Sequence, residues 1–314
     1  MQLDVGIAFF VLGLLATLLK SNIHFPKSLY QSLVLLLMLA IGLKGGVALT
    51  EHASWQLLGE SLAIIALGLV LPLIAFPILK YIGDLPRVDA AAIAAHYGSV
   101  SVGTYAVAVA FLEAQQIPYE AYIPLFVVLL EMPAIAVGIA LAKWGTKADD
   151  DKVSNKALLH EVLCNQGMVL MVGALAIGYL AGDQIDRISP LFFDLFNGIL
   201  ALFLLQMGIT AASRLNDIKR VGSFIVAFAI AMPLIGGLLG ALLSIALGLS
   251  QGGTILVAIL GASASYIAVP AAMQVALPQA NHSLSISAAL AVTFPFNVLI
   301  GIPTITVITQ QLIG

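Results

Sequence analysis

The feature that most constrains this chain is a series of ten long apolar segments. An α-helix needs about 20 apolar residues to cross the hydrocarbon core of a bilayer, whereas a strand of a membrane barrel needs only about ten alternating ones. Charged residues make up 9% of the chain, against roughly 25% in soluble domains, which excludes an ordinary water-facing surface. Because helices satisfy their own backbone hydrogen bonds in lipid, we predict an all-α integral membrane protein with ten transmembrane helices. The predicted spans are Val5–Leu19, Ser28–Leu49, Leu57–Ile82, Val88–Leu112, Ala121–Ala142, Ala157–Ala181, Ser189–Ala212, Val221–Leu249, Gly252–Leu277 and Leu284–Ile313.

The positions of Lys and Arg predict the orientation, because positively charged loops stay in the cytoplasm. With ten spans and an external N-terminus, the inner loops hold Lys20, Lys27, Lys80, Arg87, Lys143, Lys147, Lys152, Lys156, Arg214, Lys219 and Arg220. The outer side keeps only Lys44 and Arg187. We therefore predict a multi-pass protein with both termini outside. The first residues, Met1–Asp4, lack the basic region of a signal peptide, so we expect the first span to be retained.

The two halves of the chain repeat each other. Leu71–Ile74 recurs as Met232–Ile235, and Gly103–Tyr105 is matched by Ala264–Tyr266 at the same spacing of 161 residues. Since each repeat has an odd number of helices, the second is inverted in the membrane, an arrangement typical of secondary transporters. We predict a first five-helix repeat over 1–142, a cytosolic linker over 143–156 and a second, inverted repeat over 157–314.

Two segments inside the spans are unusually rich in Gly, Ser and Thr. They are His96–Tyr105 in the fourth span and Gly261–Tyr266 in the ninth, and they occupy equivalent positions in the two repeats. Glycine weakens a helix interior, and Pro270 removes a hydrogen bond, so we expect broken, crossing helices at the repeat interface. Unwound carbonyls and hydroxyls suit sodium, and N–H groups at the start of a half-helix suit a small anion. Close packing of helices through small residues stays open as the alternative.

Glu131 is the only acidic residue deep within a predicted span. A charge at that depth costs at least about 2–3 kcal/mol, so an acidic residue there is a candidate for function. It could bind a cation, relay a proton or pair with Lys44, or it could be a protonated carboxyl bonded to a neighbouring helix. Asn297 lies near the equivalent place in the second repeat.

The local sequence argues against a serine hydrolase. Gly261–Ala264 resembles part of the nucleophile motif of serine hydrolases, with His96 or His282 as a conceivable base. That motif needs glycine where Ser265 stands, and it needs a strand–turn–helix context that this chain lacks. We predict that the protein is not an enzyme.

Several segments resemble the cyanobacterial sodium-dependent bicarbonate transporter family: His96–Ser101, Leu130–Pro133, His160–Asn165, Gly261–Tyr266 and the order of ten helices. The resemblance covers essentially the whole chain. It implies symport of bicarbonate with sodium across the plasma (inner) membrane, as part of a carbon concentrating mechanism. It also implies a homotrimer whose protomers each have a core and a gate domain drawn from both repeats and move like an elevator. A PII-like, nucleotide-sensing protein would inhibit transport from the cytosolic face. Sodium is then the coupling ion, with no other cofactor and no nucleic acid partner.

The resemblance also implies the site residues. Bicarbonate would bind at Gly98, Ser99, Val100, Ser101, Gly261, Ala262, Ser263 and Ala264. Sodium would bind at Ser99, Ser101, Thr104, Glu131, Ser263, Ser265 and Asn297. Two alternatives stay open: a sodium-coupled carrier of another small organic anion, similar to bile-acid symporters, and an anion channel. Flux that saturates and requires sodium distinguishes a carrier from a channel.

Overall fold

The structure is a computed structural model that describes residues 5–21, 23–144, 166–214 and 222–313, and all regular structure in those ranges is helical. The first part of the chain forms α1 (Val5–Leu18), α2 (Lys27–His52), α3 (Trp55–Pro77), α4 (Arg87–Gly98), α5 (Val102–Ala114) and α6 (Ile123–Lys143). The second part forms α8 (Gln166–Ala181), α9 (Phe196–Ser213), α11 (Ser223–Leu247), α12 (Gln251–Ala262), α13 (Ala268–Ala276), α14 (His282–Ser287), α15 (Phe294–Phe296) and α16 (Ile302–Ile313). π-Helical turns at Ile78–Ile82, Pro190–Asp194, Ala288–Thr293 and Asn297–Gly301 and a 3₁₀ segment at Gly182–Arg187 extend or join these helices.

The helices have the length and composition of membrane spans. Within the described ranges, seven are long and apolar enough to cross a bilayer, α4 and α5 counting together as Arg87–Ala114. Three shorter apolar helices, α1, α8 and α12, accompany them. The predicted all-helical, multi-pass membrane protein is therefore confirmed. The seventh predicted span begins differently from the prediction, because Pro190 opens a π-helical turn and α9 begins only at Phe196.

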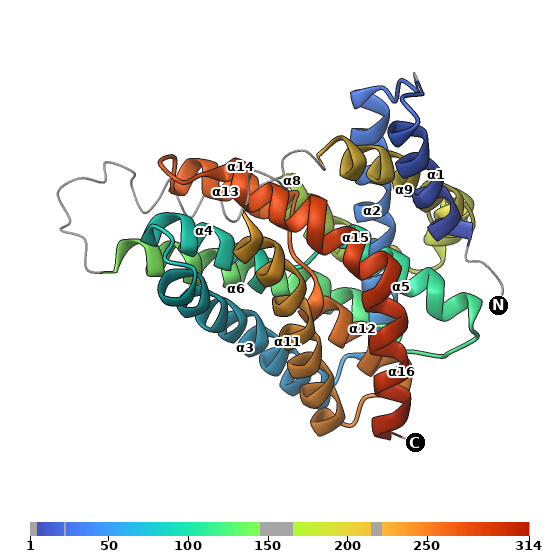
Figure 1. Cartoon of the computed structure of the whole chain (residues 1–314). Helices are drawn as coiled ribbons and strands as arrows, with labels where there is room; N and C mark the ends of the chain where they lie inside the picture. Colours follow the sequence, from blue (N-terminus) through green and yellow to red (C-terminus); the bar gives the residue numbers. More distant parts are fainter. Residues whose placement is uncertain (1–4, 22, 145–165, 215–221, 314) are drawn as a thin grey trace.

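Four of the helices form one packed group, in which α1 lies along α9 and α2 along α8. Figure 1 shows α1, α2 and α9 together at one side of the molecule. Glycine permits the close approach of these pairs, because a Cβ at Gly13 would collide with the Leu205 carbonyl and one at Gly178 with the Leu43 carbonyl. Backbones of membrane helices commonly approach each other in this way through small residues.

The remaining helices form a second packed group. α3, α4 and α6 pack against one another, and α11 packs along α12 (Figure 1). Here Gly236 of α11 and Gly261 of α12 meet backbone to backbone, since a Cβ on either would collide with the carbonyl oxygen of the other. Gly98 lies against the ring of Pro72 in the same way. The end of α12 is therefore packed against α11 without intervening side chains, and the end of α4 against α3 with only the Pro72 ring between them.

Both predicted helix breaks are present. α4 ends at Gly98, Ser99 is extended with φ −96° and ψ 179°, and α5 begins at Val102. α12 ends at Ala262, Ser263 is extended with φ −87° and ψ 167°, and α13 begins at Ala268. The expectation of local unwinding in the fourth and ninth spans is confirmed.

Candidate functional site

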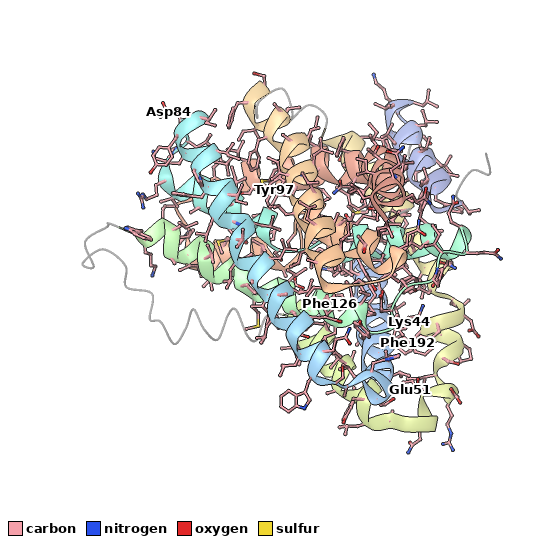
Figure 2. The ribbon with its side chains drawn as sticks, turned by 90° about the horizontal axis from the view of Figure 1, so that it is seen from below. Lys44, Glu51, Asp84, Tyr97, Phe126 and Phe192 are labelled. Carbon is pink, nitrogen blue, oxygen red and sulfur yellow. The ribbon has the colours of Figure 1, made fainter. Side chains whose placement is uncertain are left out.

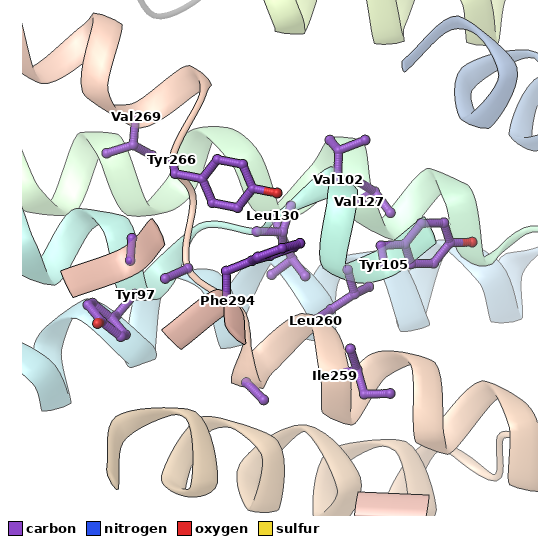
Figure 3. Close-up of a cluster of buried hydrophobic side chains, with 14 of the residues drawn as sticks. Tyr97, Val102, Tyr105, Val127, Leu130, Ile259, Leu260, Tyr266, Val269 and Phe294 are labelled. Carbon is purple, nitrogen blue, oxygen red and sulfur yellow. The ribbon is translucent and has the colours of Figure 1, made fainter. Parts of the chain in front are cut away.

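The two helix breaks lie against each other in the interior of the second group. The Ser101 amide donates to the Ser263 hydroxyl oxygen at 3.0 Å, and that hydroxyl donates to the Leu260 carbonyl at 2.8 Å. Val102, the first residue of α5, lies near Tyr266 of the second break (Figure 3). All of this backbone is buried, so each polar group there needs a partner or a ligand.

His96 makes a second connection between the breaks. The Ser265 amide donates to the His96 carbonyl at 2.8 Å. The His96 ring nitrogen Nδ1 lies 2.6 Å from the Ser265 carbonyl oxygen. The sequence suggested His96 only as the base of a serine-hydrolase motif. In the structure His96 makes two contacts to the second break.

Two helices begin at the site. Ser101 caps α5, because its hydroxyl oxygen accepts the Thr104 amide at 3.0 Å and the Thr104 hydroxyl at 2.9 Å. Ser265 accepts the Val269 amide at 3.3 Å in the first turn of α13. The first N–H groups of a helix have no partner within it, and they carry a partial positive charge that favours a small anion.

A small cavity of about 10 Å³ lies between the breaks, α2 and α6. It is lined by Met38, Val100, Ser101, Val102, Glu131, Ser265, Tyr266 and Ile267. That volume holds roughly one water-sized particle. It therefore has the size for a single dehydrated ion, and its wall includes one residue with a carboxylate and three with a hydroxyl.

Four buried oxygens at or near the breaks lack a hydrogen-bond partner among the described residues: Glu131 Oε2, Ser99 Oγ, Asn297 Oδ1 and the Tyr266 hydroxyl. All four residues are buried. Unpaired buried oxygens are rare and costly, and they are the ligands that a hard cation uses. The donor set therefore fits sodium. Within the described residues, the site included, no group of three His, Cys, Asp or Glu side chains is arranged to hold a metal ion.

Some of the predicted site residues line the cavity, and the others lie beside it at the breaks. Of the seven predicted sodium ligands, Ser101, Glu131 and Ser265 line the cavity. The others surround it at the breaks: Thr104 bonds to Ser101, and the Asn297 amide group donates to the Ala262 carbonyl at 2.8 Å. The predicted bicarbonate positions all lie in or next to the two breaks, from Gly98 to Ser101 and from Gly261 to Ala264.

Four wall residues were not among the predicted site residues: Met38, Val102, Tyr266 and Ile267. Met38 comes from α2 in the other helix group, and nothing distinguishes it from the apolar residues around it. Val102 and Tyr266 lie within the two predicted clusters, and Ile267 follows the second cluster directly. The Tyr266 ring meets Phe294 edge to face at 5.4 Å between centroids (Figure 3), and a Cβ at Gly103 would collide with its hydroxyl. Met38, Tyr266 and Ile267 also line a neighbouring cavity of about 480 Å³ bordered by Gln31 and Gln166.

The suggested pairing of Glu131 with Lys44 is wrong. The Lys44 ammonium lies 3.8 Å from the Glu113 carboxylate and 4.8 Å from the centre of the Phe196 ring. Figure 2 shows Lys44 with Glu51 and Phe192 at one end of the molecule. Lys44 thus lines a separate cavity of about 420 Å³, and Glu131 stands alone among apolar and hydroxyl-bearing neighbours.

Comparison with known proteins agrees with these features. No curated protein matches the chain. The family model of the Na⁺-dependent bicarbonate transporter superfamily matches residues 6–310, which include every helix of the fold except the last three residues of α16 and the first residue of α1. The chain therefore belongs to the Na⁺-dependent bicarbonate transporter superfamily.

Proposed function

We propose that this protein carries bicarbonate together with sodium, with both bound at the two crossing helix breaks. The observation that carries the proposal is the group of unpaired buried oxygens beside two helix N-termini. Among the described residues that line the central cavity, none is Lys or Arg. An anion there must be held by N–H groups, hydroxyls and the accompanying cation, and these suit a small monovalent anion. Neighbouring sites would also let each ion strengthen the binding of the other.

The proposed sites follow the division described above. Sodium lies with Glu131, Ser101 and Ser265 at the cavity, with Ser99, Thr104, Ser263 and Asn297 as the surrounding oxygens. Bicarbonate lies along Gly98–Ser101 and Gly261–Ala264, at the start of α5 and the end of α12. The Glu131 carboxylate beside the sodium ion offsets its charge, which lowers the cost of holding the cation in a membrane interior.

We propose that ten spans form two inverted five-helix repeats. Contacts between the equivalent clusters support this, because such contacts arise near a two-fold axis. The two breaks occupy equivalent positions in the repeats, and the Ser101 amide of the first donates to the Ser263 hydroxyl of the second. The helix pairings are also reciprocal: the first helix packs on the seventh, as the second packs on the sixth. In this scheme α1, α2, α8 and α9 form the gate domain, and the group that holds both breaks forms the core that moves like an elevator.

The family resemblance also suggests an oligomeric state, a membrane and a regulatory partner. We propose a homotrimer in the plasma (inner) membrane that supplies a carbon concentrating mechanism, with a PII-like inhibitor at the loops near Lys80–Arg87 and 214–220. Residues 215–221 lie outside the described ranges. Arg87 donates to the Trp144 and Leu141 carbonyls, so its side chain is needed for the fold and charge reversal there is uninformative. Lys80 likewise donates to the Leu85 carbonyl at 3.1 Å. Unchanged inhibitor binding after charge reversal at Arg214 would argue against this docking position.

The decisive experiment is uptake of labelled bicarbonate into proteoliposomes at alkaline pH, with an inward sodium gradient or with choline in its place. Uptake that saturates and requires sodium supports the proposal. Glu131→Gln, which keeps the shape and removes the charge, should raise the sodium concentration for half-maximal uptake at least about tenfold, the effect of losing one charged ligand contact. Glu60→Gln is the matched control, because Glu60 is also buried but bonds to Gln56 near the start of α3.

Other outcomes identify the other functions. Sodium-dependent uptake of a bile acid without uptake of bicarbonate would make the protein a carrier of organic anions. Anion flux that neither saturates nor requires sodium would make it a channel. Wild-type sodium dependence in Glu131→Gln would remove Glu131 from the sodium site.

A further inference from the structure

His96 is completely buried near the end of α4, with an exposed fraction of 0%. It touches the second helix break through both its backbone and its ring. Its carbonyl accepts the Ser265 amide at 2.8 Å, and its ring Nδ1 lies 2.6 Å from the Ser265 carbonyl oxygen. Both polar backbone groups of Ser265 are therefore bonded to this one residue of the first half of the chain.

The chemistry of this contact fixes the tautomer of the ring. A carbonyl oxygen can only accept, so Nδ1 must carry the hydrogen that it donates. In the neutral ring Nε2 then carries none, and it is buried without a hydrogen-bond partner among the described residues. The ring therefore makes its hydrogen bond through Nδ1 alone. A side chain with a single donor at the δ position would make the same bond to the Ser265 carbonyl.

Ser265 is itself part of the site. Its hydroxyl oxygen accepts the Val269 amide in the first turn of α13, and the residue lines the cavity beside Glu131. Because Ser265 lies in an unwound segment, no helical hydrogen bonds fix the orientation of its peptide groups. The two bonds to His96 supply that constraint from another helix.

We propose that His96 is a positioning residue for the sodium site, and that its Nδ1–H bond to the Ser265 carbonyl holds the second break in the geometry that binds sodium. This inference rests on the proposed function, since it assigns sodium to the cavity lined by Ser265. His96 does not line that cavity, so it acts through Ser265 and not as a ligand.

The test uses two substitutions of similar size that place a donor differently. In His96→Asn the amide nitrogen occupies the position of Nδ1, whereas in His96→Gln it lies one bond further, near the position of Nε2. Sodium binding is measured without transport, as the rise in the unfolding temperature of purified protein in detergent when sodium chloride replaces choline chloride. The sodium midpoint is the sodium concentration that gives half of the maximal rise in unfolding temperature. His96→Asn should keep this midpoint close to that of the wild-type protein. His96→Gln and His96→Ala should raise it roughly five- to tenfold, the effect expected from one lost buried hydrogen bond.

A purely structural role gives a different result. Tyr97→Phe removes a buried hydrogen bond from the next residue, whose hydroxyl lies 2.8 Å from the Thr293 hydroxyl. It should lower the unfolding temperature in choline and leave the sodium midpoint unchanged. The positioning role is refuted if His96→Gln and His96→Asn both lower the unfolding temperature in choline and leave the sodium midpoint unchanged. It is also refuted if both variants shift the sodium midpoint equally.

The proposed function can fail separately. Wild-type protein that shows no sodium-dependent stabilisation would refute the sodium site and the role of His96 with it. Protein that binds sodium but does not transport bicarbonate would leave the assignment of His96 intact and change only the substrate. If His96→Gln or His96→Ala does not fold, the comparison of His96→Asn with the other one decides the question. If His96→Asn does not fold, a sodium midpoint in His96→Gln and His96→Ala equal to that of the wild-type protein would still refute the positioning role.

Discussion

At the scale of single residues, the site depends on a serine hydroxyl that bonds to the backbones of two different helices. The Ser263 hydroxyl accepts the Ser101 amide and donates to the Leu260 carbonyl, so it joins the start of α5 to the last turn of α12. A serine in a helix interior commonly bonds only to its own backbone, as Ser244 does with the Gly240 carbonyl at 2.7 Å. The difference between these two buried serines provides a test of the site.

Ser263→Ala should weaken sodium and bicarbonate together. It leaves the buried Ser101 amide without its acceptor, which costs about 1–3 kcal/mol, and the two ions are expected to stabilise each other. We expect the sodium and bicarbonate concentrations for half-maximal uptake each to rise roughly tenfold. Ser244→Ala is the control and should leave both unchanged. Wild-type values in Ser263→Ala would leave helix packing as the explanation of the serine-rich clusters.

At the scale of helices, the breaks are held in place by glycine contacts with their neighbours. α11 and α12 touch at Gly236 and Gly261, next to the point where α12 ends. Any side chain at this contact must push the helices apart, because the atoms it meets are backbone and cannot rotate away. The close approach therefore sets the position of the second break relative to α11.

Gly236→Ala should lower the unfolding temperature of the protein in detergent. Its Cβ would collide with the Gly261 carbonyl oxygen, and overpacking of this kind costs about 1–3 kcal/mol. Gly59→Ala in α3 is the matched control, since a Cβ there meets nothing within 4 Å. That substitution should be neutral or stabilising by up to about 1 kcal/mol, because alanine favours the helix. Equal unfolding temperatures for the two variants would show that α11 and α12 can separate without cost.

At the scale of the whole molecule, polar and charged ends bound an apolar interior. Asp84 and Glu51 lie toward opposite ends of the molecule (Figure 2), and both are exposed. The distribution of Lys and Arg predicts that the end with Asp84 faces the cytoplasm. Single cysteines at these two positions can test that orientation.

In a background without Cys164, Asp84→Cys should react with a membrane-impermeant maleimide only from the cytoplasmic side. Glu51→Cys should react only from outside, because it lies at the outer end of α2 in the predicted topology. Labelling is measured in intact cells and in inverted vesicles. The reverse pattern would invert the topology, and labelling of both positions from one side would contradict the number of spans between them.

The number of sodium ions per bicarbonate decides how the membrane potential acts. One sodium with one bicarbonate is neutral, and a tenfold sodium gradient then supplies about 1.4 kcal/mol, enough for about tenfold accumulation. With two sodium ions, one net charge crosses, and each 100 mV adds about 2.3 kcal/mol. Because the central cavity holds roughly one ion, we expect accumulation to be independent of an imposed potassium-diffusion potential. Accumulation that rises with inside-negative potential would indicate a second sodium ion.

The sequence by itself determined the class of protein, the positions of the helices and the two breaks. Those features depend on local properties: apolar length decides what a segment can cross, and clustered Gly and Ser weaken the helix that contains them. Gly98–Ser101 and Gly261–Ser265 could therefore be identified without knowing what lies beside them. The family match over residues 6–310 rests on the same local information.

Only the tertiary structure decided which side chains meet. The sequence grouped seven oxygen-bearing residues as sodium ligands, but only Ser101, Glu131 and Ser265 line the cavity. It offered Lys44 as a partner for Glu131, whereas Lys44 pairs with Glu113, and it gave no sign that His96 would hold Ser265. The reason is physical: contacts between helices depend on their rotation and spacing, and those are set by close packing between residues of different helices.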